Sequence, residues 1–135
     1  MNSPTEFFDP ANRLLGKDLQ DLLNHNQGVK AALLASTDGF EVAYAGELNS
    51  SPSNIAAMTS SMLSLALAMV NETGLAPCNN LIIEAEHGRV LIMSVPNEKQ
   101  PMLLTVLTKE EVSFGQLLLD AKITVRQLSA RLENS

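Results

Sequence analysis

The feature that most constrains this chain is a stretch without charge: from Leu48 to Asn71 there is no Asp, Glu, Lys or Arg. Within it, the segment IAAMTSSMLSLALAMVNETG (55–74) has the apolar spacing of a helix. Ser51-Pro52-Ser53 is typical of a helix start and Gly74 of a helix end. A helix on the surface of a globular protein normally carries charges on its solvent side. This helix is therefore predicted to face protein on more than one side.

The apolar side chains of this helix form two ridges when the residues are placed at about 100° intervals around its axis. Together the ridges cover an arc of roughly 200°, about twice what a helix needs to pack on one sheet. We expect one ridge to pack on the domain's own sheet and the other to contact something outside the domain. The alternative is that the whole helix is ordinary core beneath a covering loop. One ridge contains Ile55, Met58, Met62, Leu65 and Met69, and the other contains Thr59, Leu63, Ala66, Leu67 and Val70.

The remaining arc of the helix is small and neutral, and it consists of Ala57, Ser60, Ser61, Ser64 and Ala68. Another backbone can approach such an arc closely, because no long side chain stands in the way. The methionines of the neighbouring ridge suit an adaptable contact surface, since an unbranched thioether can repack against different shapes. These features favour a surface that binds another protein.

A membrane span is a competing interpretation of the same helix. Its apolar part runs only from Ile55 to Val70 and is interrupted by one threonine and three serines. That is shorter than the roughly 20 mainly apolar residues that a bilayer requires, so we expect no membrane insertion. The first residues, MNSPTEFFDP, lack the basic and apolar regions of a signal peptide. The expected compartment is the cytoplasm.

Composition narrows the class of protein further. With 135 residues, 45% of them hydrophobic and 18% charged, the chain is predicted to form one globular domain. Its net charge is −6, and the nine basic residues are scattered along the sequence. Binding of nucleic acid is not expected, because no basic stripe is present to neutralise a phosphate backbone.

The rest of the sequence indicates two more helices and five strands. Asp9-Pro10 is typical of a helix start, and Asp38-Gly39 between two β-type runs is typical of a tight hairpin. The order helix, two strands, helix, three strands, helix predicts an α+β domain built on an antiparallel meander. The predicted elements are a helix from Asp9-Pro10 to Gly28, strands at Val29–Ser36 and Phe40–Ala45, the neutral helix, strands at Asn80–Glu86, Arg89–Val95 and Met102–Thr108, and a helix beginning at Ser113.

Searches for catalytic and ligand motifs give little. Gly16-Lys17 is followed by Asp18 and has no glycine five residues before Gly16, so the phosphate-binding loop pattern fails at both ends. His25 and His87 lack the spacing of metal ligands, and Cys78 is the only cysteine, which excludes an internal disulfide. We therefore predict no catalytic, metal-binding or cofactor-binding residues.

One pair of carboxylates needs a separate interpretation. Glu84 and Glu86 alternate with apolar residues, which predicts that both lie on one face of the third strand. Such a pair is compatible with acid/base catalysis. We favour a partly wet strand whose charges discourage unwanted edge pairing, and Cys78 is interpreted as a small apolar filler in preference to a nucleophile.

Four segments together resemble the Roadblock family, in its bacterial branch: LLASTDGFEVAYAG, the neutral helix, NNLIIEAEHGRVLIMSV and LLTVLTKEEVSFGQLLLDAKITVRQL. The resemblance covers residues 10–132, which leaves an N-terminal tail of residues 1–9 and a C-terminal tail of residues 133–135. It implies a profilin-like domain with a five-stranded antiparallel sheet. It also implies a homodimer in which the neutral helices lie side by side and the third strands join the two sheets. The dimer contact expected from this comprises Met58, Met62, Leu65, Met69, Ile82 and Glu84.

The resemblance also implies a function. Bacterial members of the family regulate small Ras-like GTPases, some by arranging the GTPase's own catalytic residues, while others are scaffolds or motor-associated light chains. We therefore expect a non-enzymatic dimeric regulator that binds a small GTPase through Ala57, Ser60, Ser61, Ser64 and Ala68. A dimeric adaptor that leaves GTP hydrolysis unchanged is the alternative. An enzyme that uses Glu84, Glu86 or Cys78 is a third hypothesis.

Overall fold

The computed structural model of the chain describes residues 10–109 and 111–134. The elements follow one another in the predicted order, so the α+β fold is confirmed, while the predicted capping residue Asp9 lies outside the described residues. Most predicted ends are within one or two residues of the observed ones. The elements are α2 (Pro10–His25), β1 (Val29–Ser36), β2 (Glu41–Gly46), α3 (Pro52–Glu72), β3 (Asn80–Ala85), β4 (Gly88–Val95), β5 (Met102–Thr108) and α4 (Phe114–Glu133).

The strands form one five-stranded sheet in the order β2-β1-β5-β4-β3, and all neighbours are antiparallel. The β1–β2 hairpin and the β3–β4–β5 meander are joined by pairing of β1 with β5, in which Leu33 lies opposite Thr105 and Leu34 opposite Leu104. Sequence spacing does not predict this long-range pairing. Its consequence is that β2 and β3 are the two edge strands, although α3 connects them directly.

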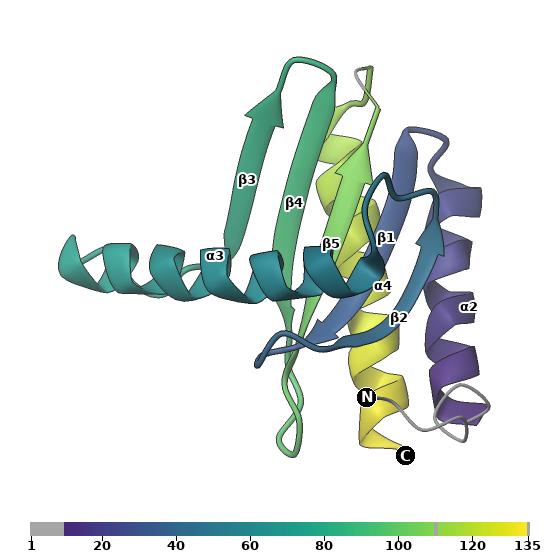
Figure 1. The fold of residues 1–135 in the computed structure, drawn as a ribbon, viewed down its shortest axis with the longest axis horizontal. Helices are drawn as coiled ribbons and strands as arrows, with labels where there is room; N and C mark the ends of the chain where they lie inside the picture. The colour runs from purple at the N-terminus through teal and green to yellow at the C-terminus, as the bar shows by residue number, and fades with distance from the viewer. Residues whose placement is uncertain (1–9, 110, 135) are drawn as a thin grey trace.

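Helices cover both faces of the sheet (Figure 1). α2 and α4 lie side by side on one face, and the main core lies between them and the sheet. Because both faces are covered at β1, seven of its eight residues are buried. Leucines supply most of the fully buried large side chains in this core: Leu19, Leu34, Leu91, Leu104, Leu117 and Leu128.

α3 crosses the strands on the opposite face, and its first half is fixed there by a small buried contact. The hydroxyls of Thr59 and Thr105 lie 2.9 Å apart and are both buried. Leu63 packs with Ile92 and Leu103 beside this pair. The N-terminal half of α3 is therefore anchored on the middle of the sheet.

The second half of α3 projects beyond β3 (Figure 1). A helix of 21 residues is about 31 Å long, whereas the outer strands of a five-stranded sheet are only about 19 Å apart. α3 is thus longer than the sheet is wide. As a result, Leu67 is 42% exposed although it belongs to the ridge that faces the sheet.

The seam between α2 and α4 contains two buried carboxylates. Arg131 donates hydrogen bonds to the carboxylate of Asp18 at 2.7 and 3.0 Å, and these bonds raise the pKa of the Arg131 guanidinium. Asp120 accepts hydrogen bonds from the amides of Asn26 and Gln116 at 2.8 and 2.9 Å. The ion pair between Arg131 and Asp18 therefore links α4 to α2.

Candidate functional site

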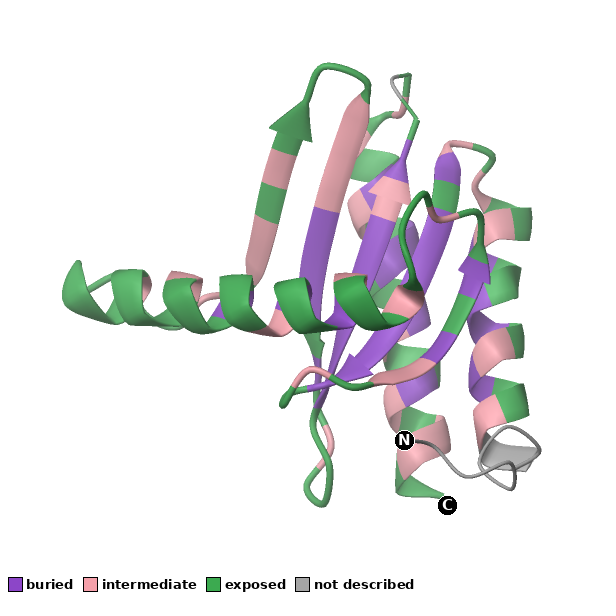
Figure 2. Ribbon diagram, viewed as in Figure 1, coloured by how far each residue is buried: buried purple, intermediate pink, exposed green. Residues whose placement is uncertain are grey.

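The two ridges of α3 differ in exposure, as the sequence predicts (Figure 2). Thr59 and Leu63 are buried against the sheet, whereas Met58, Leu65 and Met69 are 59%, 72% and 69% exposed. Met62 is 37% exposed. The ridge with Thr59 and Leu63 packs on the sheet as predicted, but the division is incomplete, because Ile55 of the other ridge packs beside Leu33 and Ala35 of β1. The alternative of a helix buried beneath a loop is wrong, because most of the outer ridge is exposed. We call the exposed set Met58, Met62, Leu65 and Met69 the α3 flank.

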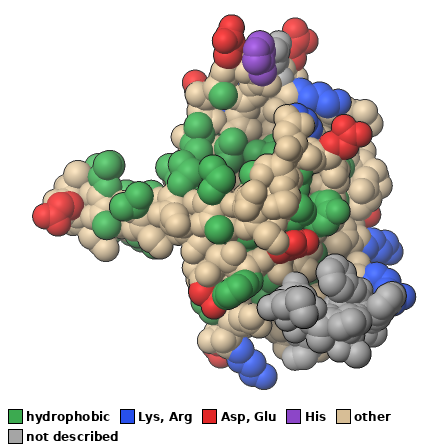
Figure 3. Space-filling model, in the orientation of Figure 1, with side chains coloured by type: hydrophobic (Ala, Val, Ile, Leu, Met, Phe, Trp, Pro, Cys, Tyr) green, Lys and Arg blue, Asp and Glu red, His purple; other side chains and the backbone are tan. Residues whose placement is uncertain are grey.

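The second half of α3, which carries Leu65 and Met69 of the α3 flank, forms an arm that projects from the body of the domain (Figures 1 and 3). Met58 and Met62 lie on the first half of the helix, which is anchored on the sheet. Hydrophobic side chains gather along the visible side of this arm and on the sheet beside it, and an acidic side chain marks its tip. No charged residue interrupts α3 before Glu72. Exposed apolar surface of this extent, without charge, is typical of a surface that binds another protein.

The small arc of α3 is only partly free. Ala57, Ser61, Ser64 and Ala68 are exposed, but Ser60 is half-buried and its hydroxyl donates to the backbone oxygen of Thr37 at 2.6 Å. Ser60 therefore fixes α3 to the β1–β2 turn and is less accessible than the other four residues of the small arc. The assignment of all five residues to the GTPase-binding surface stays a prediction.

Gly39 explains how the β1–β2 turn lies so close to the helix. Its φ angle is +94°, a conformation that residues with a Cβ rarely adopt. A Cβ at this position would lie 3.4 Å from the Cα of Ala57. The turn and α3 thus pack backbone to backbone, at the end of the helix opposite to the projecting arm.

β3 is an edge strand and pairs only with β4 among the described residues. Ile82 and Glu84 point toward the α4 face of the sheet, because side chains alternate along a strand and Ile82 lies opposite buried Leu91 of the main core. Leu81 packs with Leu63 of α3 on the other face. The six predicted dimer residues therefore lie on both faces of the sheet: the four residues of α3 on one face, and Ile82 and Glu84 on the other. Leu81, which the sequence analysis did not single out, is the β3 residue that packs against α3.

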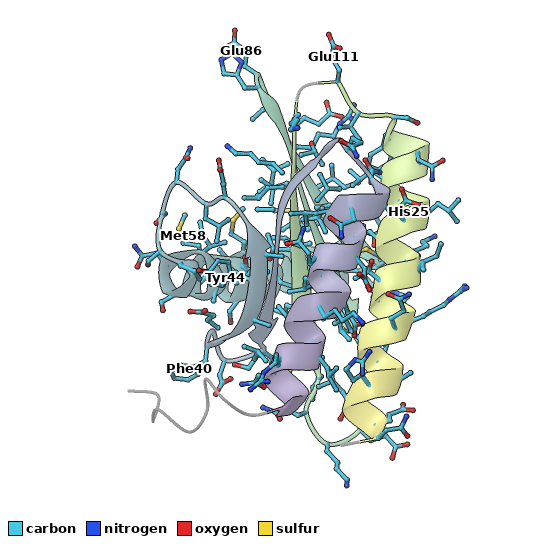
Figure 4. The ribbon with its side chains drawn as sticks, turned by 90° about the vertical axis from the view of Figure 1, so that its right-hand side faces the viewer. His25, Phe40, Tyr44, Met58, Glu86 and Glu111 are labelled. Atoms are coloured by element: carbon cyan, nitrogen blue, oxygen red, sulfur yellow. The ribbon has the colours of Figure 1, made fainter. Side chains whose placement is uncertain are left out.

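The predicted pair of strand carboxylates is not formed. β3 ends at Ala85, and Glu86 lies in the following turn, at the tip of the β3–β4 hairpin (Figure 4). Glu84 instead faces Arg89 across the strands, with Nε and Oε1 3.5 Å apart. The interpretation of Glu84 and Glu86 as neighbours on one strand face is wrong, and so is an acid/base site built on them.

Arg89 is held by three neighbours. Besides Glu84, its Nη1 donates to the backbone oxygen of Val112 at 3.0 Å, and its guanidinium lies 5.5 Å from the centre of the Phe114 ring. The side chain is only 28% exposed. These contacts join the β3–β4 hairpin to the start of α4, which gives Arg89 a structural role.

The other candidates for chemistry are separated in the fold. Cys78 is half-buried, and its thiol donates to the backbone oxygen of Asn80 at 3.6 Å. His25 lies at the end of α2 (Figure 4), with its Nε2 3.6 Å from Asp120. No group of three metal-ligating side chains occurs within residues 10–109 and 111–134. The described residues offer no assembled catalytic set.

α3 also meets the minimum length and composition of a membrane span, with a mean hydropathy of 1.4 over its most apolar window. The sequence argument that its apolar part is too short is therefore not sufficient. The topology provides a stronger argument, because α3 connects β2 and β3 of one sheet. A spanning helix would place these two strands on opposite sides of a bilayer, so this fold is incompatible with a span through α3.

A five-stranded antiparallel sheet with two helices on one face and a single helix across the other defines a profilin-like domain. The family profile described as "Roadblock/LC7 domain" matches residues 15–108. The chain therefore belongs to the Roadblock/LC7 domain family.

Known proteins agree with this assignment. An uncharacterised protein of Methanocaldococcus jannaschii is 28% identical over 108 residues, which are 80% of this chain and 88% of the relative. Among solved structures, Myxococcus xanthus MglB has a TM-score of 0.79 at 16% identity and covers 90% of this chain and 97% of its own. An MglB in a tetrameric arrangement has a TM-score of 0.80 at 18% identity, with coverages of 93% and 92%.

Profilin itself is also similar to this chain. Profilin IB of Acanthamoeba castellanii has a TM-score of 0.53 at 15% identity and covers 87% of this chain and 98% of its own. The Roadblock resemblance and the profilin-like fold are thus confirmed. Assignment to the bacterial branch stays a prediction, as do the domain boundaries at residues 9/10 and 132/133.

Proposed function

We propose that this protein is a dimeric, non-enzymatic regulator of a small Ras-like GTPase, which it binds through α3. The observation that carries the proposal is the α3 flank, an uncharged and largely exposed apolar surface that continues onto the projecting second half of the helix. The Roadblock family resemblance supplies the class of partner, since regulators of small GTPases are the members that the sequence resembles.

Burial of the apolar flank side chains is the proposed source of the free energy for pairing of two copies. Burial of a Met or Leu side chain contributes about 1.5–3 kcal/mol. The four flank side chains of each copy together are of the order needed to offset the roughly 4–15 kcal/mol cost of association. The free edge of β3 lies beside the arm and offers backbone hydrogen bonds to a second strand. The tetrameric arrangement of one MglB, a protein of similar fold, is consistent with association of copies.

The GTPase contact is assigned to the exposed part of the small arc, Ala57, Ser61, Ser64 and Ala68. These side chains lie beside the flank on the same helix, so both surfaces can be occupied at once. Their small size allows a partner's backbone to approach closely. An adaptor that assembles a complex without changing GTP hydrolysis uses the same surfaces and remains the second candidate.

A binding experiment tests the proposal and separates the two surfaces. Immobilised wild-type protein is incubated with lysate of its own source in buffers containing a GTP analogue or GDP, and retained proteins are identified by mass spectrometry. We expect a small GTPase to be retained in a nucleotide-dependent manner. Ser64→Lys should keep the dimer and abolish retention, because it adds bulk and charge to the small arc alone.

The matched control is Gln127→Lys on α4, an exposed position on the opposite side of the domain. It adds the same side chain and should leave retention intact. Retention of the GTPase by Ser64→Lys at wild-type affinity would contradict the assigned surface. Stimulated hydrolysis of GTP by the captured GTPase would favour a regulator, and an unchanged rate would favour the adaptor.

A further inference from the structure

The five methionines within the described residues fall into two groups by exposure. Met58, Met62 and Met69 are 59%, 37% and 69% exposed, and all three belong to the α3 flank. Met93 and Met102 are 6% and 4% exposed and lie in the main core. Among the described residues, the exposed methionine side chains are therefore confined to one surface.

We propose that Met58, Met62 and Met69 form a modification site for oxidants of the hydroperoxide class, and that their oxidation separates the paired copies. The inference rests on the proposed function, because it takes the α3 flank as the surface that pairs with a second copy. It goes beyond that function in assigning a redox control to the pairing.

The chemistry needs only the thioether and the peroxide. The sulfur attacks one peroxide oxygen, an S–O bond forms and the O–O bond breaks. The sulfur loses two electrons, and the other peroxide oxygen leaves as hydroxide, or as an alkoxide from an organic hydroperoxide. The leaving group takes the proton from the oxygen now bound to sulfur and becomes water or an alcohol. The product is methionine sulfoxide, which methionine sulfoxide reductases return to methionine.

The consequence for pairing follows from the chemistry of the surface. A sulfoxide oxygen is a strong hydrogen-bond acceptor, and burial of such a group without a donor is unfavourable. The α3 flank carries no charged or long polar side chain that could act as a donor. Oxidation therefore opposes burial of the flank against a second copy.

The fold itself should tolerate the change, because the flank lies on the side of α3 that does not pack on the sheet. The helix is held by Thr59, Leu63 and their partners on β4 and β5, and these residues carry no reactive sulfur. Oxidation of Met93 or Met102, in contrast, would place a polar group in the core. We therefore predict that oxidation of the exposed methionines affects pairing, whereas oxidation of the buried methionines affects the stability of the fold.

Pairing also controls access to the sulfur atoms. The flank is covered in the dimer and open in the separated copies, so the oxidant acts on the separated fraction. Oxidation should therefore become slower as protein concentration rises. An ordinary surface methionine shows no such dependence.

The experiment uses the full chain treated with hydrogen peroxide. Peptide mass spectrometry follows a mass gain of one oxygen at each methionine, and sedimentation equilibrium gives the dissociation constant. We expect Met58, Met62 and Met69 to be modified before Met93 and Met102, and dimer dissociation to become easier by about a hundredfold or more. Circular dichroism should stay unchanged, and reduction by methionine sulfoxide reductase should restore the dimer.

A matched variant removes the sulfur and keeps the apolar volume. The triple variant Met58→Leu, Met62→Leu, Met69→Leu should pair before and after peroxide, because leucine and methionine are similar in size. Cys78→Ser should respond to peroxide like the wild type, which excludes the thiol as the target.

The outcomes separate the two proposals. A wild-type protein that carries three flank sulfoxides and still pairs with unchanged affinity would overturn this inference alone. Dissociation of the triple leucine variant by peroxide, or equally rapid oxidation of Met93 and Met102, would also overturn it. A wild-type protein that is monomeric before treatment would overturn the proposed pairing together with its redox control.

Discussion

At the scale of single residues, two buried hydroxyls decide where α3 lies on the sheet. Thr59 and Thr105 are 3% and 1% exposed, and their hydroxyls form a hydrogen bond of 2.9 Å with each other. The sequence placed Thr59 on an apolar ridge but gave no reason for a hydroxyl there. That reason needs the strand order, because Thr105 is far away in the sequence and reaches the helix only through the sheet.

We predict that Thr59→Val destabilises the domain by about 1–3 kcal/mol, since it leaves the Thr105 hydroxyl buried without a partner. Urea unfolding followed by circular dichroism measures this change. The double variant Thr59→Val, Thr105→Val should be closer in stability to the wild type than the single variant, because both partners are replaced by apolar groups. A single variant as stable as the wild type would show that the hydroxyl pair does not anchor α3.

Arg89 lies next to the turn between β3 and β4, and an arginine near a turn tip is a candidate for an arginine finger, a side chain that stabilises the transition state of a bound GTPase. Its contacts with Glu84, Val112 and Phe114 occupy the guanidinium within the domain. We predict that Arg89→Ala lowers stability but changes the stimulated rate of GTP hydrolysis by less than about tenfold, compared with about 10³–10⁵ for loss of a finger. The assay uses saturating partner and correction for the folded fraction.

Arg126→Ala is the control for this assay, because Arg126 is exposed on α4. It should alter neither stability nor rate. A loss of about three orders of magnitude for Arg89→Ala, with binding retained, would show that the finger comes from this protein.

At the scale of elements, the sequence predicts every helix and strand that the structure describes, because each has its own periodicity and its own start or end signal. The errors in these predictions lie mainly at the ends of helices and strands. The alternation of Glu84, Ala85 and Glu86 continues the strand pattern past its true end, and only the tight turn before Gly88 stops it. The polar seam between α2 and α4 was missed for a related reason: Asp18 and Asp120 lie within apolar faces, where a charge is buried only if a partner helix supplies hydrogen bonds.

The length of α3 is the element property with the largest consequence for function. The sequence gives its length, but the width of the sheet follows from the number of strands and their packing beside one another. Only the comparison of the two shows that the helix extends past β3. The exposed flank is thus predictable as an apolar arc, whereas the projection of its C-terminal part, Leu65 and Met69, past the edge of the sheet is not.

At the scale of the whole molecule, the fold separates charged and uncharged surfaces onto the two faces of the sheet. The α2–α4 layer carries ion pairs and polar seams, and α3 carries an uncharged surface. The strand order β2-β1-β5-β4-β3 makes β3 an edge beside the projecting arm. This strand order depends on the pairing of β1 with β5, two strands that are far apart in the sequence. Local sequence signals contain no information about which distant strands pair.

Met62→Glu tests whether the uncharged surface is a contact between copies. A carboxylate at this position would be buried in an apolar interface at a cost of several kcal/mol, so the variant should be monomeric. Leu119→Glu makes the same kind of change at an exposed leucine on α4, which is 55% exposed on the opposite layer. This control should pair like the wild type.

The most direct measurement is the mass of the untagged wild-type protein in solution, determined by sedimentation equilibrium at micromolar concentration beside these two variants. The chain has a mass of 14.5 kDa. We predict twice that mass for the wild type and Leu119→Glu, and the mass of one chain for Met62→Glu. A wild-type protein with the mass of one chain, or a Met62→Glu variant with the mass of two, would contradict the assignment of α3 as the surface that joins two copies.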